Sequence, residues 1–86
     1  MYLHIGGDVI VPFRDVVGIF DYVTSDAAAT RDFLKVSREE GFTFSATDIS
    51  HVKSFVVANG RVYLSPIACT TLRKRWNSLI LTTEEL

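Results

Sequence analysis

His4, His51 and Cys69 are the side chains of this 86-residue chain best suited to nucleophilic or metal chemistry. The histidines are far apart in the sequence, and a single cysteine leaves no Cys/His spacing typical of a zinc site. Gly6 and Gly7 lack the further glycine and the Gly-Lys-Ser/Thr ending of a phosphate-binding loop. We therefore expect no enzyme, metal, cofactor or small-molecule substrate, and we interpret Cys69 as a small apolar packing residue.

The charged residues are distributed unevenly between the two halves of the chain. Residues 1–50 carry four basic and eight acidic residues, a balance of −4, whereas residues 51–86 carry five basic and two acidic residues, a balance of +3. The net charge of −1 argues against a strongly basic nucleic-acid-binding protein. The asymmetry nevertheless indicates an anionic partner. The alternative is that the halves neutralise each other, within the fold or between subunits.

The segment Phe55–Pro66, FVVANGRVYLSP, predicts a β-hairpin. Asn59 and Gly60 favour a two-residue type I′ turn, which requires positive φ at both residues. Counting outward from this turn gives each face of the hairpin an apolar set, because opposed residues share a face. The two sets are Phe55, Val57, Val62 and Leu64, and Val56, Ala58 and Tyr63. Both faces therefore need cover, from a helix of this chain or from a second copy.

Short β-prone runs predict the rest of a sheet. Tyr2–Ile5 and Val9–Val11 flank a turn composition and predict a first hairpin. Asp15–Val23 predicts a third strand, in which Gly18 indicates a bulge or a close backbone approach. Alternating apolar and polar residues in Phe42–Thr47 predict a half-buried strand. With the second hairpin, these runs make a small, mostly antiparallel sheet of about five or six strands.

Two helices are expected. The first begins at the cap residues Thr24–Asp26 and ends at Gly41, because glycine suits the left-handed conformation that terminates a helix. Its apolar stripe is predicted to contain Ala29, Phe33, Val36 and Glu40, with Leu34 and Ser37 beside it. The second helix is expected over Ile67–Asn77, with Arg73–Arg75 in its last turn, where cations suit the helix dipole.

Three stretches of the chain carry a resemblance to a known family. They are YLHIGGDVIVPFRDVV at residues 2–17, the helix end Glu40–Phe42, and KSFVV through VYLSPI within residues 53–67. Together they resemble the RemA/RemB family of bacterial regulators of extracellular-matrix (biofilm) genes, with RemB as the nearer branch. The resemblance extends to about Trp76. It implies DNA binding without enzymatic activity and, as in the best-understood branch, a ring-shaped homo-oligomer that holds DNA along positively charged outer loops.

The resemblance also indicates candidate DNA-binding residues. The family's arginine-rich loop before the second hairpin corresponds here to Ser50–Ser54, which supplies His51 and Lys53. A second family arginine corresponds to Arg14 or to a position next to it. The further candidates, on charge alone, are Arg73, Lys74 and Arg75. Their expected role is phosphate contact, which positions DNA without reading its bases.

We expect one α+β domain over residues 1–86, with residues 78–86 as a C-terminal tail whose apolar Leu79–Leu81 docks on the fold. No signal peptide or membrane-spanning run is apparent, so we expect a cytoplasmic, nucleoid-associated protein without a membrane partner. The expected function is transcriptional regulation of extracellular-matrix genes by a ring-like homo-oligomer, larger than a dimer, bound to double-stranded DNA. The alternative is a Rem-like interaction module with weak or no DNA binding, because Ser50–Ser54 contains no arginine.

Overall fold

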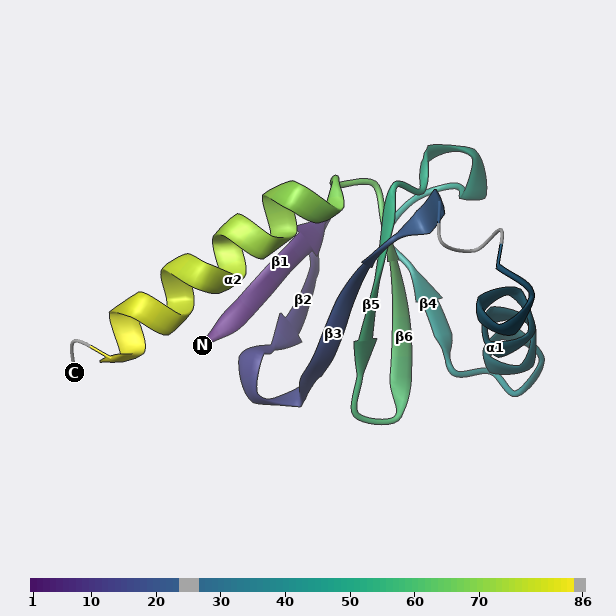
Figure 1. The fold of residues 1–86 in the computed structure, drawn as a ribbon, viewed down its shortest axis with the longest axis horizontal. Coiled ribbons are helices and arrows are strands. Elements are labelled where there is room, and N and C mark those ends of the chain that lie inside the picture. The colour runs from purple at the N-terminus through teal and green to yellow at the C-terminus, as the bar shows by residue number, and fades with distance from the viewer. Residues whose placement is uncertain (24–26, 85–86) are drawn as a thin grey trace.

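An α+β fold of six strands and two α-helices is present in the part of the chain that the computed structural model describes, residues 1–23 and 27–84 (Figure 1). In chain order the elements are β1 (Tyr2–Gly6), β2 (Val9–Pro12), η1 (Phe13–Asp15), β3 (Val16–Asp21), α1 (Ala28–Glu39), β4 (Thr43–Ser45), η3 (Ile49–His51), β5 (Ser54–Ala58), β6 (Arg61–Ser65) and α2 (Cys69–Glu84), where η marks a short 3-10 helix. The fold class is therefore the predicted one.

The strands form two sheets rather than one. β1 and β2 make a separate antiparallel hairpin, and the larger sheet has the order β3-β5-β6-β4. β4 runs parallel to β6, because the chain reverses direction once before β5 and again at the β5–β6 turn. The larger sheet is therefore mixed, whereas the sequence predicted a single, mostly antiparallel sheet.

The β5–β6 hairpin has the register that its turn predicts. Val57 pairs with Val62 and Val56 with Tyr63, so the two apolar sets lie on opposite faces. The prediction of a type I′ turn is wrong, however. Gly60 has a φ of 78°, but no non-glycine residue among those described has positive φ, and Asn59 therefore does not. Positive φ is unfavourable for a residue with a Cβ, and glycine alone supplies it here.

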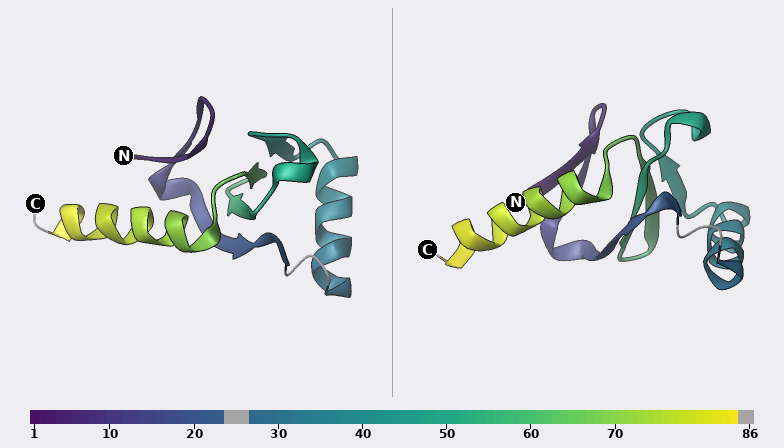
Figure 2. Two further views of the ribbon diagram at one scale, coloured as in Figure 1. Left: turned by 90° about the horizontal axis from the view of Figure 1, so that it is seen from above. Right: turned by 45° about the horizontal axis from the view of Figure 1, so that its top comes forward.

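Different parts of the same chain cover the two faces of the larger sheet (Figures 1 and 2). On one face the sheet packs against the β1–β2 hairpin and α2. This core includes Val56, Ala58 and Tyr63 of the sheet and Leu3, Ile5, Val11, Cys69 and Leu72 of its cover. On the other face α1 contributes a single buried apolar side chain, Leu34, against Phe55, Val62 and Leu64. Cys69 is buried, as its predicted packing role requires.

The end of α1 is as predicted, but its buried face is not. Gly41 has a φ of 77°, and the next residue, Phe42, donates its backbone N–H to the carbonyl of Ser37 at 2.8 Å, the bond of a Schellman helix end. The buried side chains are Leu34 and Ser37, whereas two residues of the predicted apolar stripe, Phe33 and Val36, are 45% and 56% exposed. The Ser37 hydroxyl hydrogen-bonds that of Thr43 at 2.9 Å and so fixes this rotation of the helix.

Both helices also differ from prediction in extent. α1 begins at Ala28 with Ala27 at the cap position, and the predicted caps Thr24–Asp26 lie outside the described residues. α2 continues to Glu84 rather than ending at Asn77, because half-buried Leu79 packs on the core and extends the apolar face of the helix. Arg73–Arg75 therefore lie within the helix and not in its last turn.

Candidate nucleic-acid interface

His51 and Lys53 lie on the loop that enters β5, at the open end of the β5–β6 hairpin. Both residues are exposed, and Nδ1 of His51 lies 3.2 Å from the hydroxyl of Ser50. The backbone of Lys53 is held on two sides: its N–H donates to the Ser65 carbonyl at 2.8 Å, and its carbonyl accepts from Tyr22 at 3.0 Å. The loop therefore presents a cationic side chain from a fixed backbone.

Two buried serines anchor this end of the hairpin. Ser54 and Ser65 pair across the strands and are both 0% exposed. The Ser54 hydroxyl donates to the Ile67 carbonyl at 2.6 Å, and the Ser65 hydroxyl donates to the Ile5 carbonyl at 2.5 Å and accepts from the Ile67 N–H at 3.0 Å. They tie the loop to β1 and to the entry of α2. Sequence analysis missed them because serine is usually a surface residue; their opposed positions in two apolar strands were the available signal.

Arg14 lies at the opposite end of the sheet from Lys53. Its side chain is 90% exposed, and its Nε is 4.0 Å from the carboxylate of Asp15. The Asp15 carbonyl accepts a 2.8 Å hydrogen bond from Asn59, which places η1 beside the β5–β6 turn. The six residues of β3 separate the two ends by roughly 17 Å at the usual rise of a strand. The structure therefore does not bring Arg14 together with His51 and Lys53.

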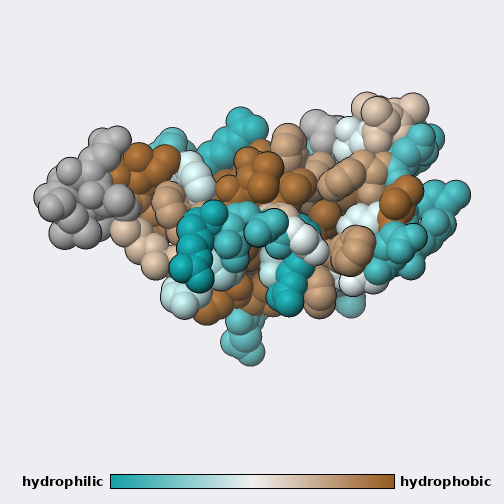
Figure 3. Space-filling view, turned by 90° about the horizontal axis from the view of Figure 1, so that it is seen from below, coloured by the Kyte–Doolittle hydropathy of each residue, from teal (hydrophilic) through white to brown (hydrophobic). Residues whose placement is uncertain are grey.

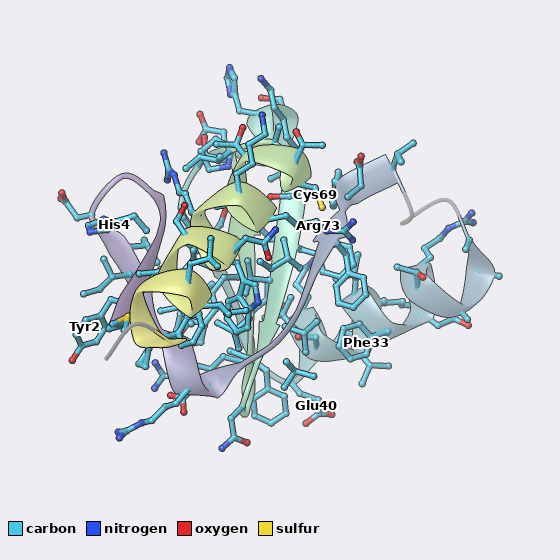
Figure 4. All side chains as sticks on the ribbon, turned by 60° about the vertical axis from the view of Figure 1, so that its left-hand side comes forward. Tyr2, His4, Phe33, Glu40, Cys69 and Arg73 are labelled. Atoms are coloured by element: carbon cyan, nitrogen blue, oxygen red, sulfur yellow. The ribbon has the colours of Figure 1, made fainter. Side chains whose placement is uncertain are left out.

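The three consecutive cations of α2 point in different directions. Arg73 donates from Nη2 to the Ile19 carbonyl on β3 at 3.2 Å, and Arg75 donates from Nη1 to the His4 carbonyl on β1 at 3.0 Å. Figure 4 shows Arg73 on the β3 side of the helix and His4 on the other side. Lys74 is exposed between them. Successive helical residues are about 100° apart at 3.6 residues per turn, so these side chains do not form one basic patch.

A metal site and a membrane-spanning helix are both absent from the described residues. Within residues 1–23 and 27–84, no group of three histidine, cysteine or acidic side chains is placed to hold a metal ion. In the same part of the chain, neither helix combines the length and apolarity needed to span a bilayer. The remaining chemistry of the site is that of exposed cations, which suits anionic partners.

Comparison with known proteins shows the family of the chain. A family model for RemA-like proteins, described as extracellular matrix regulatory protein A-like, matches residues 2–76. The chain belongs to this family. The match contains both candidate loops and the three α2 cations, Arg73, Lys74 and Arg75. Extracellular matrix regulatory protein B of Bacillus subtilis (strain 168) is 37% identical to this RemA-like chain over 76 residues, which cover 87% of the chain and 89% of the relative. The resemblance seen in the sequence is therefore confirmed, and the family is one of extracellular matrix regulators.

Proposed function

We propose that this RemA-like protein regulates transcription of extracellular-matrix genes by binding double-stranded DNA as a ring-shaped homo-oligomer larger than a dimer. The observation that carries the proposal is the exposed His51 and Lys53 pair on a loop whose backbone is hydrogen-bonded on two sides. This loop corresponds to the arginine-rich loop of the family's DNA-binding branch. Because the backbone is already ordered, little conformational entropy is lost when the loop meets a phosphate.

Repetition around a ring supplies the affinity that one subunit lacks. One or two phosphate contacts bind weakly, and each contact is lost readily as salt rises. Several identical loops on one oligomer engage the same duplex at a high effective concentration, so their contributions combine. Contacts of this kind position the protein on DNA without reading bases.

Arg14 defines a second possible contact at the other end of each subunit. Since η1 and the Ser50–Ser54 loop lie at opposite ends of β3, each has to be tested separately. A variant at Arg14 reports on the end that carries the β5–β6 turn, and a variant at Lys53 reports on the open end of the hairpin.

The test is a salt-dependent DNA titration by fluorescence anisotropy, paired with a native mass measurement of the free oligomer. We expect Lys53→Ala or Arg14→Ala to weaken binding to all sequences alike and to make the salt slope shallower by roughly one unit per lost contact. Lys35→Ala is the matched control, because Lys35 is an exposed lysine on α1, away from both loops. Unchanged salt slopes in both variants would contradict phosphate contact through these residues.

The alternative is a Rem-like interaction module that acts through another regulator. The composition of the Ser50–Ser54 loop favours it, because Lys53 is its only permanently charged side chain. A purified oligomer that does not bind DNA at about 50 mM salt, where phosphate contacts are strong, would replace the DNA-binding proposal with this one.

A further inference from the structure

Three exposed side chains of α1 and of the turn after it are apolar. Phe33, Val36 and Phe42, here called the α1 patch, are 45%, 56% and 51% exposed and border a hollow of about 300 Å³ against β5 and β6. Figure 3 shows hydrophobic side chains interspersed with hydrophilic ones across the middle of the molecular face seen from below. Leu34 is the side chain that α1 buries in the core on this face of the sheet, whereas Phe33, Val36 and Phe42 are not part of that core.

Acidic side chains lie beside Val36, on the α1 side of the patch. On a helix, neighbours on the surface are three or four residues apart. Val36 has Asp32, Glu39 and Glu40 at these spacings, and all three are exposed. The cations of α1 are Arg31, Lys35 and Arg38, and none stands three or four residues from Phe33 or Val36. The α1 patch is therefore an apolar surface with acidic residues on its α1 side and the cation Arg61 on its β6 side.

A second surface has the opposite charge. A groove of about 730 Å³ lies between β1 and α2, with Tyr2, Leu3 and Leu79 among its apolar lining. Its lining includes the cations Lys74 and Arg75 as well as His4, and no acidic residue is among the described residues that line it. Tyr2 is 56% exposed beside the helix (Figure 4). We call this surface the α2 groove.

The two surfaces lie at opposite ends of the molecule. The subunit measures 40 × 24 × 22 Å, with α1 at one end of the long axis and the β1–α2 pair at the other (Figures 1 and 2). A contact between two different surfaces repeats from copy to copy, and it closes into a ring when the rotation permits. Complementary charge around such a contact fixes its register and steers association.

We propose that the α1 patch of one subunit docks in the α2 groove of the next. This inference rests on the ring proposed above and names the surfaces that form it. Glu39 and Glu40 then face Lys74 and Arg75 across the contact, so the opposite charges of the two halves of the chain are neutralised between subunits. Lys74 is in that case a subunit contact and not a DNA contact.

Two single substitutions block one surface each. Val36→Asp adds a carboxylate to the acidic side of the α1 patch, and Lys74→Glu reverses a charge in the α2 groove. Both side chains are exposed in the subunit, so the fold should survive, and circular dichroism checks it. Lys35→Glu makes the same charge reversal on α1 outside the patch and is the control. If Val36→Asp does not fold, Glu40→Lys blocks the same surface.

The expected result distinguishes a head-to-tail contact from a symmetric one. Each blocked variant alone should raise the subunit dissociation constant by about tenfold or more, while the control assembles like the wild type. An equimolar mixture should give a heterodimer and nothing larger, because the patch of the Lys74→Glu copy and the groove of the Val36→Asp copy remain intact. Native mass spectrometry and sedimentation velocity read out both effects.

Other outcomes overturn the inference in different ways. If both variants assemble as the wild type does, the ring stands and the assigned surfaces are wrong. If each variant dissociates and their mixture stays monomeric, the contact is symmetric and the head-to-tail pairing is wrong. A wild-type protein that is monomeric at micromolar concentration would overturn this inference together with the proposed ring.

Discussion

Ser65→Ala is the substitution most directly connected to the end of the hairpin that carries His51 and Lys53. The Ser65 hydroxyl is 0% exposed and joins two distant segments, by donating to the Ile5 carbonyl at 2.5 Å and accepting from the Ile67 N–H at 3.0 Å. Alanine removes this hydroxyl and leaves both main-chain groups without that partner. The link between β6, β1 and the entry of α2 is lost in one step.

The magnitude follows from the burial of those two groups. Leaving a buried donor or acceptor unsatisfied costs about 1–3 kcal/mol. Ile5 is 0% exposed, so its carbonyl should incur the full cost, whereas Ile67 is only half-buried and its N–H should incur less. We expect the free energy of unfolding to fall by about 2–3 kcal/mol in total. A domain of this length has about 4–13 kcal/mol available, so the loss is large but should leave the protein folded.

Urea unfolding, followed by circular dichroism at fixed protein concentration, measures the effect. With an m value of about 1 kcal/mol/M, the midpoint should fall by about 2–3 M. Ser50→Ala is the control, because Ser50 is exposed and its hydroxyl pairs with the neighbouring His51; its change should stay within about 0.5 kcal/mol. A Ser65→Ala midpoint equal to that of the control would refute the reasoning, since the two main-chain groups would then have found other partners.

Two further substitutions test the helix end and the charge of the loop. Gly41→Val should lower the free energy of unfolding by about 1 kcal/mol or more. The cause is backbone strain, because an added Cβ meets nothing within 4 Å. Gly41→Asn should lower the free energy of unfolding by less, and equal urea midpoints for both variants and the wild type would contradict the strain. His51→Glu places a carboxylate on the loop and should weaken DNA binding in the anisotropy titration, because it repels phosphate; an affinity equal to that of the wild type would remove His51 from the interface.

Local sequence predicted the structure correctly where a few neighbouring residues set the conformation of the backbone. The β5–β6 register follows from the length of the Asn59–Gly60 turn and the period of two along each strand. Gly41 ends α1 because the left-handed conformation is accessible to glycine at little cost. The bulge at Gly18 also appears where the sequence predicted it, as a shift in register after Val16. Family membership was likewise readable from the chain, since collinear stretches identified it.

Tertiary structure decided which side of each helix or strand is buried in the core. The stripe of Phe33 and Val36 has a helical period, but Leu34 and Ser37 are buried instead, because the sheet offers apolar contacts and a hydroxyl partner on that side. Periodicity alone cannot tell a stripe that packs on the subunit's own core from one exposed to a partner.

The candidate site depended on the same long-range arrangement. Charge alone grouped Arg73–Arg75 with Lys53, yet the carbonyls of Ile19 and His4 hold two of these arginines on opposite sides of α2. Likewise β3 separates Arg14 from the loop of Lys53. The sequence alone determined the hairpin, the helix end and, through its collinear stretches, the family. The positions of the cations depended on pairings between residues far apart in the chain, which no local pattern encodes.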